Sequence, residues 1–309
     1  MNYKELAEKL KTEKFSRGGR CCAGCGIPVI VRHILAQTNN PIVASVATSC
    51  LEVTSTIYPY NAWNIPCIHN AFENAAATIS GVEKAWIARN KKGKLDNNQK
   101  KIKFVAFAGD GGAYDIGLQS ISGAMERGHN FLMVVYDNEG YMNTGGQRSS
   151  ATPIGASTTT APAGKVKQGK EEFKKDFMKI LSAHRLPYLA QAAVHNLPDL
   201  VQKAEKALKT NGPTALVVLS PCPTVWGFQP FRTLEVSRLA FETNFWPLYE
   251  IENQKYKITA KPAVQKPIEE FLKGQKRFAH LVGKPERIKI IQDFVNKEWQ
   301  RLSGLEKTP

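Results

Sequence analysis

The sequence predicts an α/β fold in which a parallel sheet is flanked by helices. Two short apolar runs, residues 102–108 and 131–136, have the character of buried strands. Between them, residues 116–127 carry Leu118, Ile121 and Met125 at helical spacing. A strand–helix–strand unit of this kind nearly always closes right-handed with its strands parallel. Asp110 and Asn138, which directly follow the two strands, are therefore expected at the same edge of the sheet, where open α/β folds bind ligands.

The residues that follow these strands predict a site for a diphosphate and a magnesium ion. Gly109, Gly111 and Gly112 surround Asp110 and allow the backbone to approach a diphosphate closely. A carboxylate, the Asn138 amide oxygen and a nearby backbone carbonyl are hard oxygen ligands suited to Mg²⁺. A GDG run alone is a weak signal, because such turns end many strands. Its combination with DN one strand–helix–strand unit later, a spacing of about 25 residues, is far more specific.

Two other glycine motifs do not fit. A dinucleotide-binding fingerprint requires a glycine or alanine where this chain has Tyr114, and the GxxxxGK[ST] pattern of a P-loop does not occur.

The remaining elements are predicted in chain order. Residues 1–15 form an amphipathic, charged helix without the apolar centre of a signal peptide. A helix near 27–35, a strand near 42–47 and a second helix with apolar positions from 75 to 86 follow. The polar segment 90–101 is a surface loop, and residues 144–170, rich in Gly, Ser, Thr and Pro, are expected to form an ordered cover over the site.

The C-terminal third completes the sheet and adds an extension. Helices are expected at 173–184 and 198–210, and a strand at 214–219 brings Cys222 to the sheet edge. Residues 256–309 are predicted to be a basic helical extension, packed on the main domain (residues 1–255) or on a partner subunit. Its last helix places Ile288, Ile291, Val295, Trp299 and Leu302 on one face.

Composition limits the class of protein. A hydrophobic content of 42% is sufficient for a sizeable core, and no apolar stretch approaches the ~20 residues needed to span a bilayer. We therefore expect a cytoplasmic protein with reduced thiols and no membrane partner. The net charge of +15 is spread over the chain without a nucleic-acid-binding motif, which favours an acidic protein partner or a phosphate-rich substrate over nucleic acid.

Four of the six cysteines are candidates for metal ligation. Cys22 and Cys25 form a CxxC pair, whereas Cys50 and Cys222 stand alone. A zinc ribbon requires a second close pair, and Cys222 precedes a proline, as cluster ligands often do. From the residues alone, an iron–sulfur cluster, a zinc site and buried thiols all stay open.

Several segments together resemble a known family. CAGCG, ATSCLEV, IHNAFENAAATISG, FAGDGGAYDIGLQS, YDNEGYMNTGGQRS and SPCPTVW occur in the order found in the thiamine-diphosphate (ThDP) binding β subunit of pyruvate:ferredoxin oxidoreductase. The resemblance extends over residues 15–300. It implies a ThDP-binding fold, Mg²⁺ held by Asp110, Asn138 and the Gly140 carbonyl, and one [4Fe–4S] cluster. The implied cluster ligands are Cys22, Cys25, Cys50 and Cys222.

Two cysteines lie outside that ligand set. Cys21 stands where the family usually has an apolar residue, but the CxxC spacing from Cys25 selects Cys22. Cys67 is expected to be a buried thiol.

The resemblance also suggests roles near the cofactor. Asn143 is expected beside the bound substrate, and Thr144 and Gly145 at the diphosphate and pyrimidine. Thr48 and Ser49 adjoin Cys50 and are expected to donate hydrogen bonds to the cluster or to ThDP. His69 precedes a predicted helix, where it could hold phosphate at the helix N-terminus.

The implied function is oxidative decarboxylation of pyruvate with coenzyme A to acetyl-CoA, CO₂ and reduced ferredoxin, or the reverse synthase reaction. No glutamate here fits the role of activating ThDP, so an α subunit is expected to supply it, and a γ/δ-type subunit further clusters. Oxalate and branched-chain 2-oxoacids are alternative substrates. A non-redox ThDP decarboxylase, or a basic zinc- or nucleic-acid-binding protein, is a more distant alternative.

Overall fold

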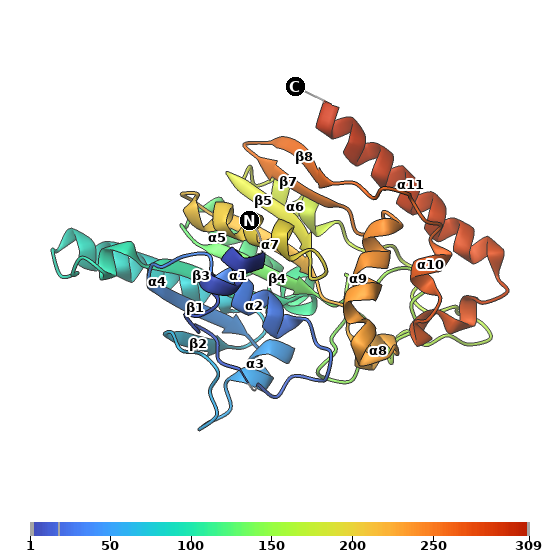
Figure 1. The fold of residues 1–309 in the computed structure, drawn as a ribbon, viewed down its shortest axis with the longest axis horizontal. Coiled ribbons are helices and arrows are strands. Elements are labelled where there is room, and N and C mark those ends of the chain that lie inside the picture. Colours follow the sequence, from blue (N-terminus) through green and yellow to red (C-terminus); the bar gives the residue numbers. More distant parts are fainter. Residues whose placement is uncertain (1–2, 18, 308–309) are drawn as a thin grey trace.

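An eight-stranded, mostly parallel sheet forms the centre of the molecule (Figure 1). The computed structural model describes residues 3–17 and 19–307. The strand order is β2-β1-β3-β4-β6-β5-β7-β8. The first six strands are parallel; at one edge β7 pairs antiparallel with β5, and β8 pairs antiparallel with β7. The strands are β1 (Ile42–Ala47), β2 (Cys67–Asn70), β3 (Lys103–Gly109), β4 (Leu132–Asp137), β5 (Tyr188–Ala193), β6 (Thr214–Leu219), β7 (Leu248–Glu252) and β8 (Lys255–Ala260).

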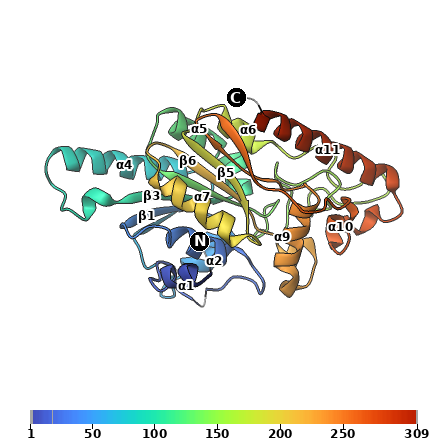
Figure 2. The ribbon, with the colours of Figure 1, turned by 45° about the horizontal axis from the view of Figure 1, so that its top comes forward.

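Helices cover both faces of the sheet, as expected where parallel strands are apolar on both sides. Along β4, Leu132, Val134 and Tyr136 face one core and Met133 and Val135 the other. The first core is covered by α2 (Ile27–Leu35) and α7 (Leu197–Lys209), the second by α4 (Ala75–Lys91), α5 (Leu118–Glu126) and α6 (Phe177–Ser182). The end of α4 and the polar loop after it project from the body (Figure 2).

Short helices near the carboxyl ends of the strands shape the site. They are α3 (Cys50–Ser55), the π-helical turn η2 (Gly111–Ile116), α8 (Pro223–Trp226), η3 (Pro230–Arg232), α10 (Glu269–Leu272) and η4 (Lys276–Leu281). The other helices are α1 (Tyr3–Lys9), η1 (Gln99–Lys101), α9 (Thr233–Glu242) and α11 (Pro285–Lys307).

Many predicted elements are confirmed. The helix at 27–35 and the strands at 42–47 and 214–219 have the predicted bounds. Two predicted helices are shorter: the one at 173–184 spans only Phe177–Ser182, and the one at 1–15 spans Tyr3–Lys9, with residues 1–2 outside the described part. Strands β2, β5, β7 and β8 were not predicted. Among them, β5 is rich in alanine and lacks the β-branched residues typical of strands.

The C-terminal part continues the sheet before it becomes helical. The β7–β8 hairpin spans Leu248–Ala260, so the predicted boundary at 255/256 falls inside it. Helix α11 packs against β8 (Figure 1), and the Glu306 carboxylate accepts a 2.8 Å hydrogen bond from the Ile258 amide. Ile291, Val295 and Leu302 are buried on the inner face of α11. Within the described residues, every helix is too short or too polar to cross a membrane.

Candidate functional site

Four adjacent strands carry the predicted ligand residues at their carboxyl ends. In sheet order, β1 is followed by Cys50, β3 by Asp110, β4 by Asn138 and β6 by Cys222. Because all four strands are parallel, these residues share one edge of the sheet. The strand pairing therefore brings together the glycine-rich motif, the DN pair and two isolated cysteines.

The side chains of Asp110 and Asn138 and the Gly140 carbonyl converge between β3 and β4. The Asn138 side-chain nitrogen donates hydrogen bonds to Oδ1 of Asp110 at 2.8 Å and to the Gly140 carbonyl oxygen at 3.0 Å. A half-turn of this amide would place its oxygen there instead, and the three groups would then present three oxygen atoms to a cation. Adjacent ligands of an octahedral Mg²⁺ are about 3 Å apart, since each lies 2.0–2.1 Å from the metal. The donor set thus fits Mg²⁺.

The environment of Asp110 also calls for a cation. Its side chain is fully buried, and its Oδ2 accepts a hydrogen bond from Ser149 at 2.5 Å. Burial raises the pKa of Asp110 well above its usual range, and the nearby carboxylate of Asp137 adds to the rise. A bound cation would offset both effects and favour the ionised form.

Two buried carboxylates flank Asn138 and are paired with cations. Lys174, from the long loop before α6, lies 2.7 Å from Asp137 and 3.3 Å from Glu139. Arg277, from η4, lies 2.7 Å from Glu139. With Asp110, the cluster holds three carboxylates and two basic side chains. This balance leaves one negative charge for a metal ion to compensate.

The predicted diphosphate residues share one small cavity. Residues that line it include Gly109, Gly111, Gly112, Asn138, Gly140, Asn143, Thr144, Ser49 and Cys50. Its volume is about 20 Å³, which is far too small for ThDP. The Tyr141 ring fills the space beside Gly111, where an added Cβ atom would lie 2.4 Å from the ring, and its hydroxyl donates to the Gly111 carbonyl at 3.1 Å.

The turn after Gly140 carries the residues predicted to contact the cofactor. Asn143 is exposed, and within the described part of the chain its side chain makes no hydrogen bond. The Thr144 hydroxyl is 2.5 Å from the Gln147 side-chain oxygen, and Gly145 adopts a positive φ of 120° that a larger residue would rarely tolerate. A free amide at the mouth of the cavity is available to a substrate.

The four predicted cluster ligands gather at the same sheet edge. Burial raises the pKa of Cys50 to about 12, and the neighbouring thiols of Cys222 and Cys22 contribute to the rise. Burial likewise raises the pKa of Cys222. Cys25 is also within electrostatic range of Cys50. Thiols that oppose each other's ionisation in this way suit a cationic iron–sulfur centre. Within residues 3–17 and 19–307, no three His, Cys, Asp or Glu side chains converge on a single metal ion.

The CxxC turn is attached to the segment after Cys222. An added Cβ atom on Gly24, whose φ is +75°, would lie 2.3 Å from the Pro230 carbonyl oxygen, so only glycine fits. The Thr233 hydroxyl donates to the Gly24 carbonyl at 2.7 Å. These contacts bring the CxxC turn to the segment that follows β6 and Cys222, although 209 residues separate Gly24 from Thr233 in the chain.

Cys21 occupies a position of its own. Its sulfur is 3.0 Å from the Thr54 hydroxyl, and a hydrogen bond with the Cys25 thiol lowers the pKa of Cys21 to about 6. Cys22 is exposed and interacts electrostatically with Cys50 and Cys222. Cys67, predicted to be buried, is partly buried in β2, and burial raises its pKa to about 12.

The other predicted residues take local roles. The Ser49 hydroxyl donates to the Ala47 carbonyl and caps α3, and the Thr48 hydroxyl donates to the Asn70 carbonyl at 2.6 Å. His69 was predicted to hold phosphate at a helix N-terminus, and that role stays a prediction. His69 lies in the edge strand β2, six residues before α4 begins at Ala75, with its ring largely exposed and 3.3 Å from Glu52.

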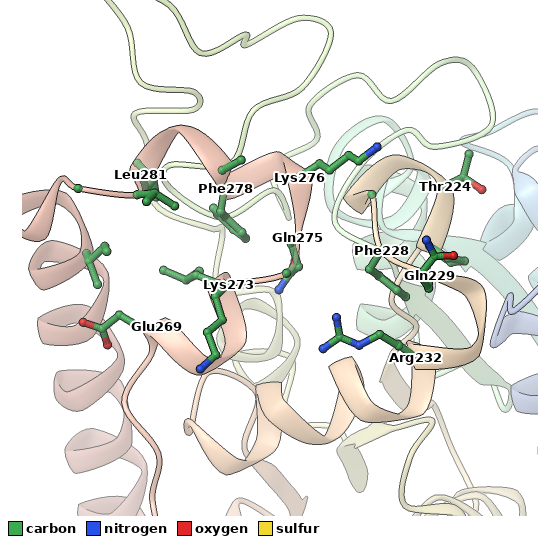
Figure 3. Close-up of a pocket in the computed structure, with 18 residues that line it drawn as sticks. Thr224, Phe228, Gln229, Arg232, Glu269, Lys273, Gln275, Lys276, Phe278 and Leu281 are labelled. Carbon is green, nitrogen blue, oxygen red and sulfur yellow. The ribbon is translucent and has the colours of Figure 1, made fainter.

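A much larger cavity lies beyond Pro223. It has a volume of about 790 Å³ and is formed between α8–α9 and α10–η4 (Figure 3). Phe228 and Phe278 contribute to a largely apolar wall, and Arg232, Glu269 and Lys273 lie around it (Figure 3). It does not include the glycine-rich turns, so it is separate from the predicted diphosphate site.

Sequence reasoning missed three residues that organise the site. Trp226 is fully buried, and its indole N–H donates to the Asn138 carbonyl at 2.8 Å. Lys174 and Arg277 compensate the buried carboxylates from distant segments. The acidic pair around Asn138 was the available signal, because buried carboxylates require cationic partners.

Comparisons with known proteins agree with this arrangement. A family model described as "Thiamine pyrophosphate enzyme, C-terminal TPP binding domain" matches residues 47–218. Pyruvate synthase subunit PorB of Thermotoga maritima is 49% identical, over 99% of this chain and 97% of its own length. PorB of Methanocaldococcus jannaschii is 49% identical over 94% of this chain and 97% of its own.

Two further proteins extend the comparison. The ketoisovalerate oxidoreductase subunit VorB of Pyrococcus abyssi is 43% identical, over 95% of this chain and 93% of its own. Among solved structures, a 2-oxoglutarate:ferredoxin oxidoreductase from Magnetococcus marinus matches with a TM-score of 0.57 and 20% identity, over 74% of this chain and 80% of that one. This last likeness shows a shared fold.

Proposed function

The chain belongs to the family of thiamine-diphosphate enzyme subunits that includes PorB of pyruvate synthase, and from this premise we propose that it is the ThDP-binding subunit of a 2-oxoacid:ferredoxin oxidoreductase acting on pyruvate. The observation that carries the proposal is the spatial order of the proposed ligand residues along one edge of the sheet. Asp110 and Asn138 lie between Cys50 and Cys222, so a diphosphate site and a thiolate site adjoin. A plain decarboxylase has no need for the second site.

Asp110, Asn138 and the Gly140 carbonyl would hold the Mg²⁺ that anchors the diphosphate. The Ser149 hydroxyl holds the Asp110 carboxylate by donating to Oδ2, and the backbone N–H of Asn138 donates to Oδ1 at 3.2 Å. The exposed amide of Asn143 would orient the substrate at the mouth of the cavity. When bound, ThDP supplies the carbanion chemistry by which a 2-oxoacid is decarboxylated.

Cys22, Cys25, Cys50 and Cys222 would bind one [4Fe–4S] cluster that accepts electrons one at a time. Partly buried thiols exclude water from the cluster, whereas the exposed Cys22 lies on the side open to a partner. The proposal includes an α subunit that completes the ThDP site, a γ/δ-type subunit with further clusters, and coenzyme A as the acyl acceptor. The net charge of +15 favours an acidic electron acceptor such as ferredoxin.

A branched-chain 2-oxoacid is the second candidate substrate, because the VorB relative is 43% identical along almost the whole chain. The test is anaerobic purification of the complex through this chain, followed by iron, sulfide and ThDP analysis. Reduction of ferredoxin is then assayed with pyruvate, 2-ketoisovalerate and oxalate, with and without coenzyme A. Four irons per cluster and a pyruvate rate that depends on coenzyme A are expected. ThDP without iron would refute the redox proposal, and a preference for 2-ketoisovalerate would reassign the substrate.

A further inference from the structure

Arg277 is a buried cation held in a fixed orientation. Its side chain is 3% exposed. The guanidinium carbon lies 3.5 Å from the centroid of the Trp226 ring, and Nε donates to the Gln275 side-chain oxygen at 2.9 Å. Gln275 is labelled in Figure 3, on the wall of the large cavity. A guanidinium stays charged even when buried and stacks well on an indole, so this side chain holds a permanent positive charge.

One side of Arg277 faces the predicted magnesium site. Its Nη2 lies 2.7 Å from Oε2 of Glu139, the residue between two proposed Mg²⁺ ligands. Neither atom has a hydrogen-bond partner of acceptable geometry. Electrostatic attraction and the stack on Trp226 therefore hold this pair together, and the guanidinium is not fully satisfied by the carboxylate.

Trp226, on which Arg277 stacks, links this guanidinium to Cys222, a proposed cluster ligand four residues earlier in the chain. Trp226 connects the same elements through hydrogen bonds. Its backbone N–H donates to the Cys222 carbonyl at 3.0 Å, and its indole N–H donates to the Asn138 carbonyl at 2.8 Å.

We propose that Arg277 is a positioning residue that places a fixed positive charge between the two cofactor sites and so raises the reduction potential of the cluster. The inference rests on the proposed function, since it requires a cluster on the four cysteines. A buried positive charge favours the reduced cluster, because reduction adds a negative charge in a region of low dielectric. Through Glu139, the same charge steadies the turn that carries the magnesium ligands.

The test compares reduction potentials in the intact complex by redox titration with EPR detection. R277M alone would leave the buried Glu139 with Lys174, at 3.3 Å, in place of two cationic partners, and it risks misfolding. The informative pair is therefore E139Q and the double variant E139Q/R277M, which both lack the carboxylate and differ only in Arg277. R277K is the conservative control, because it keeps the charge but cannot stack as a guanidinium does.

The double variant is expected to have the lower potential of the pair. At a fixed solution potential, its ratio of reduced to oxidised cluster should fall about tenfold relative to E139Q, which corresponds to about 59 mV for one electron. R277K should remain close to wild type. Equal potentials in E139Q and E139Q/R277M, with wild-type iron and sulfide contents in both, would overturn this inference and leave the proposed function intact. Absence of iron from the wild-type complex would overturn both.

Discussion

Replacing Asp110 with asparagine should have opposite effects on cofactor binding and on stability. Asparagine keeps the shape of the side chain, and its oxygen can still accept the hydrogen bond from the backbone N–H of Asn138, which is 3.2 Å long. Its nitrogen can donate to the Ser149 hydroxyl, which now accepts instead of donating. The substitution therefore removes the negative charge and replaces a carboxylate ligand by a neutral amide oxygen, with little change in packing.

The expected magnitudes follow from the site. Loss of an outer-sphere partner commonly weakens a metal site 10- to 100-fold, so loss of the charge on a direct ligand should weaken Mg²⁺-dependent ThDP binding by about 100-fold, or about 2.7 kcal/mol. In the absence of Mg²⁺, the same change removes a fully buried carboxylate whose pKa burial raises. It should stabilise the metal-free protein by about 1–3 kcal/mol.

The assay is calorimetric titration of ThDP into the complex stripped with a chelator, at fixed Mg²⁺, together with thermal unfolding with and without Mg²⁺ and ThDP. D110N should bind weakly and unfold at a higher temperature when metal-free. D293N, the same substitution on an exposed position of α11, should match wild type in both assays. Wild-type ThDP affinity in D110N would refute the assignment of Asp110 as a magnesium ligand.

Three other predictions concern single side chains. C222S should lose most of the cluster iron whereas C21S retains it, as measured by iron and sulfide analysis; equal losses would show that Cys21 is also a ligand. W226F removes the hydrogen bond to the turn after β4 and should weaken ThDP binding by about 1–3 kcal/mol. W246F, which removes an indole hydrogen bond of the same 2.8 Å length to β5, should bind ThDP as wild type does; an equal loss in both variants would contradict the specific role of Trp226. Burial lowers the pKa of His195 to about 4, below its unfolded value of about 6.5. The contribution of neutral His195 to the free energy of unfolding is therefore complete above pH 6.5 and is lost as pH falls toward 4. Unfolding of H195Q should accordingly depend less on pH between 6.5 and 4, and an unchanged dependence would contradict this.

The parts of the fold that could be predicted are those whose signal is local. Apolar runs bounded by turns indicated β1, β3, β4 and β6, and the crossover rule placed Asp110 and Asn138 at one edge. The alanine-rich β5 was missed because its burial results from the neighbouring strands β6 and β7 and not from its own propensity. The GDG turn continues into the π-helix η2, a variation that a strand-end motif does not reveal.

The candidate site was predictable only for its ligands. Their residue types carry the chemistry, so Asp110, Asn138 and the cysteines stand out in the sequence. The residues that hold the ligands in place do not. Arg277 lies in a basic segment that resembles solvated surface, and its burial depends on the stack over Trp226, which no spacing rule connects to it. Long-range ion pairs of this kind become visible only when the chain is folded.

The contact between Glu306 and Ile258 has a consequence for how the molecule avoids association. β8 is the outer strand of the sheet, and unpaired amides on such a strand can recruit a strand from another molecule. Glu306, in the last turn of α11, occupies the Ile258 amide and pairs with Lys261 at 3.0 Å. The last turn of α11 thereby covers part of the outer edge of β8. Shortening α11 by its final turn would uncover a template for strand addition, and aggregation would follow although every residue at the sheet edge that binds cofactor is unchanged.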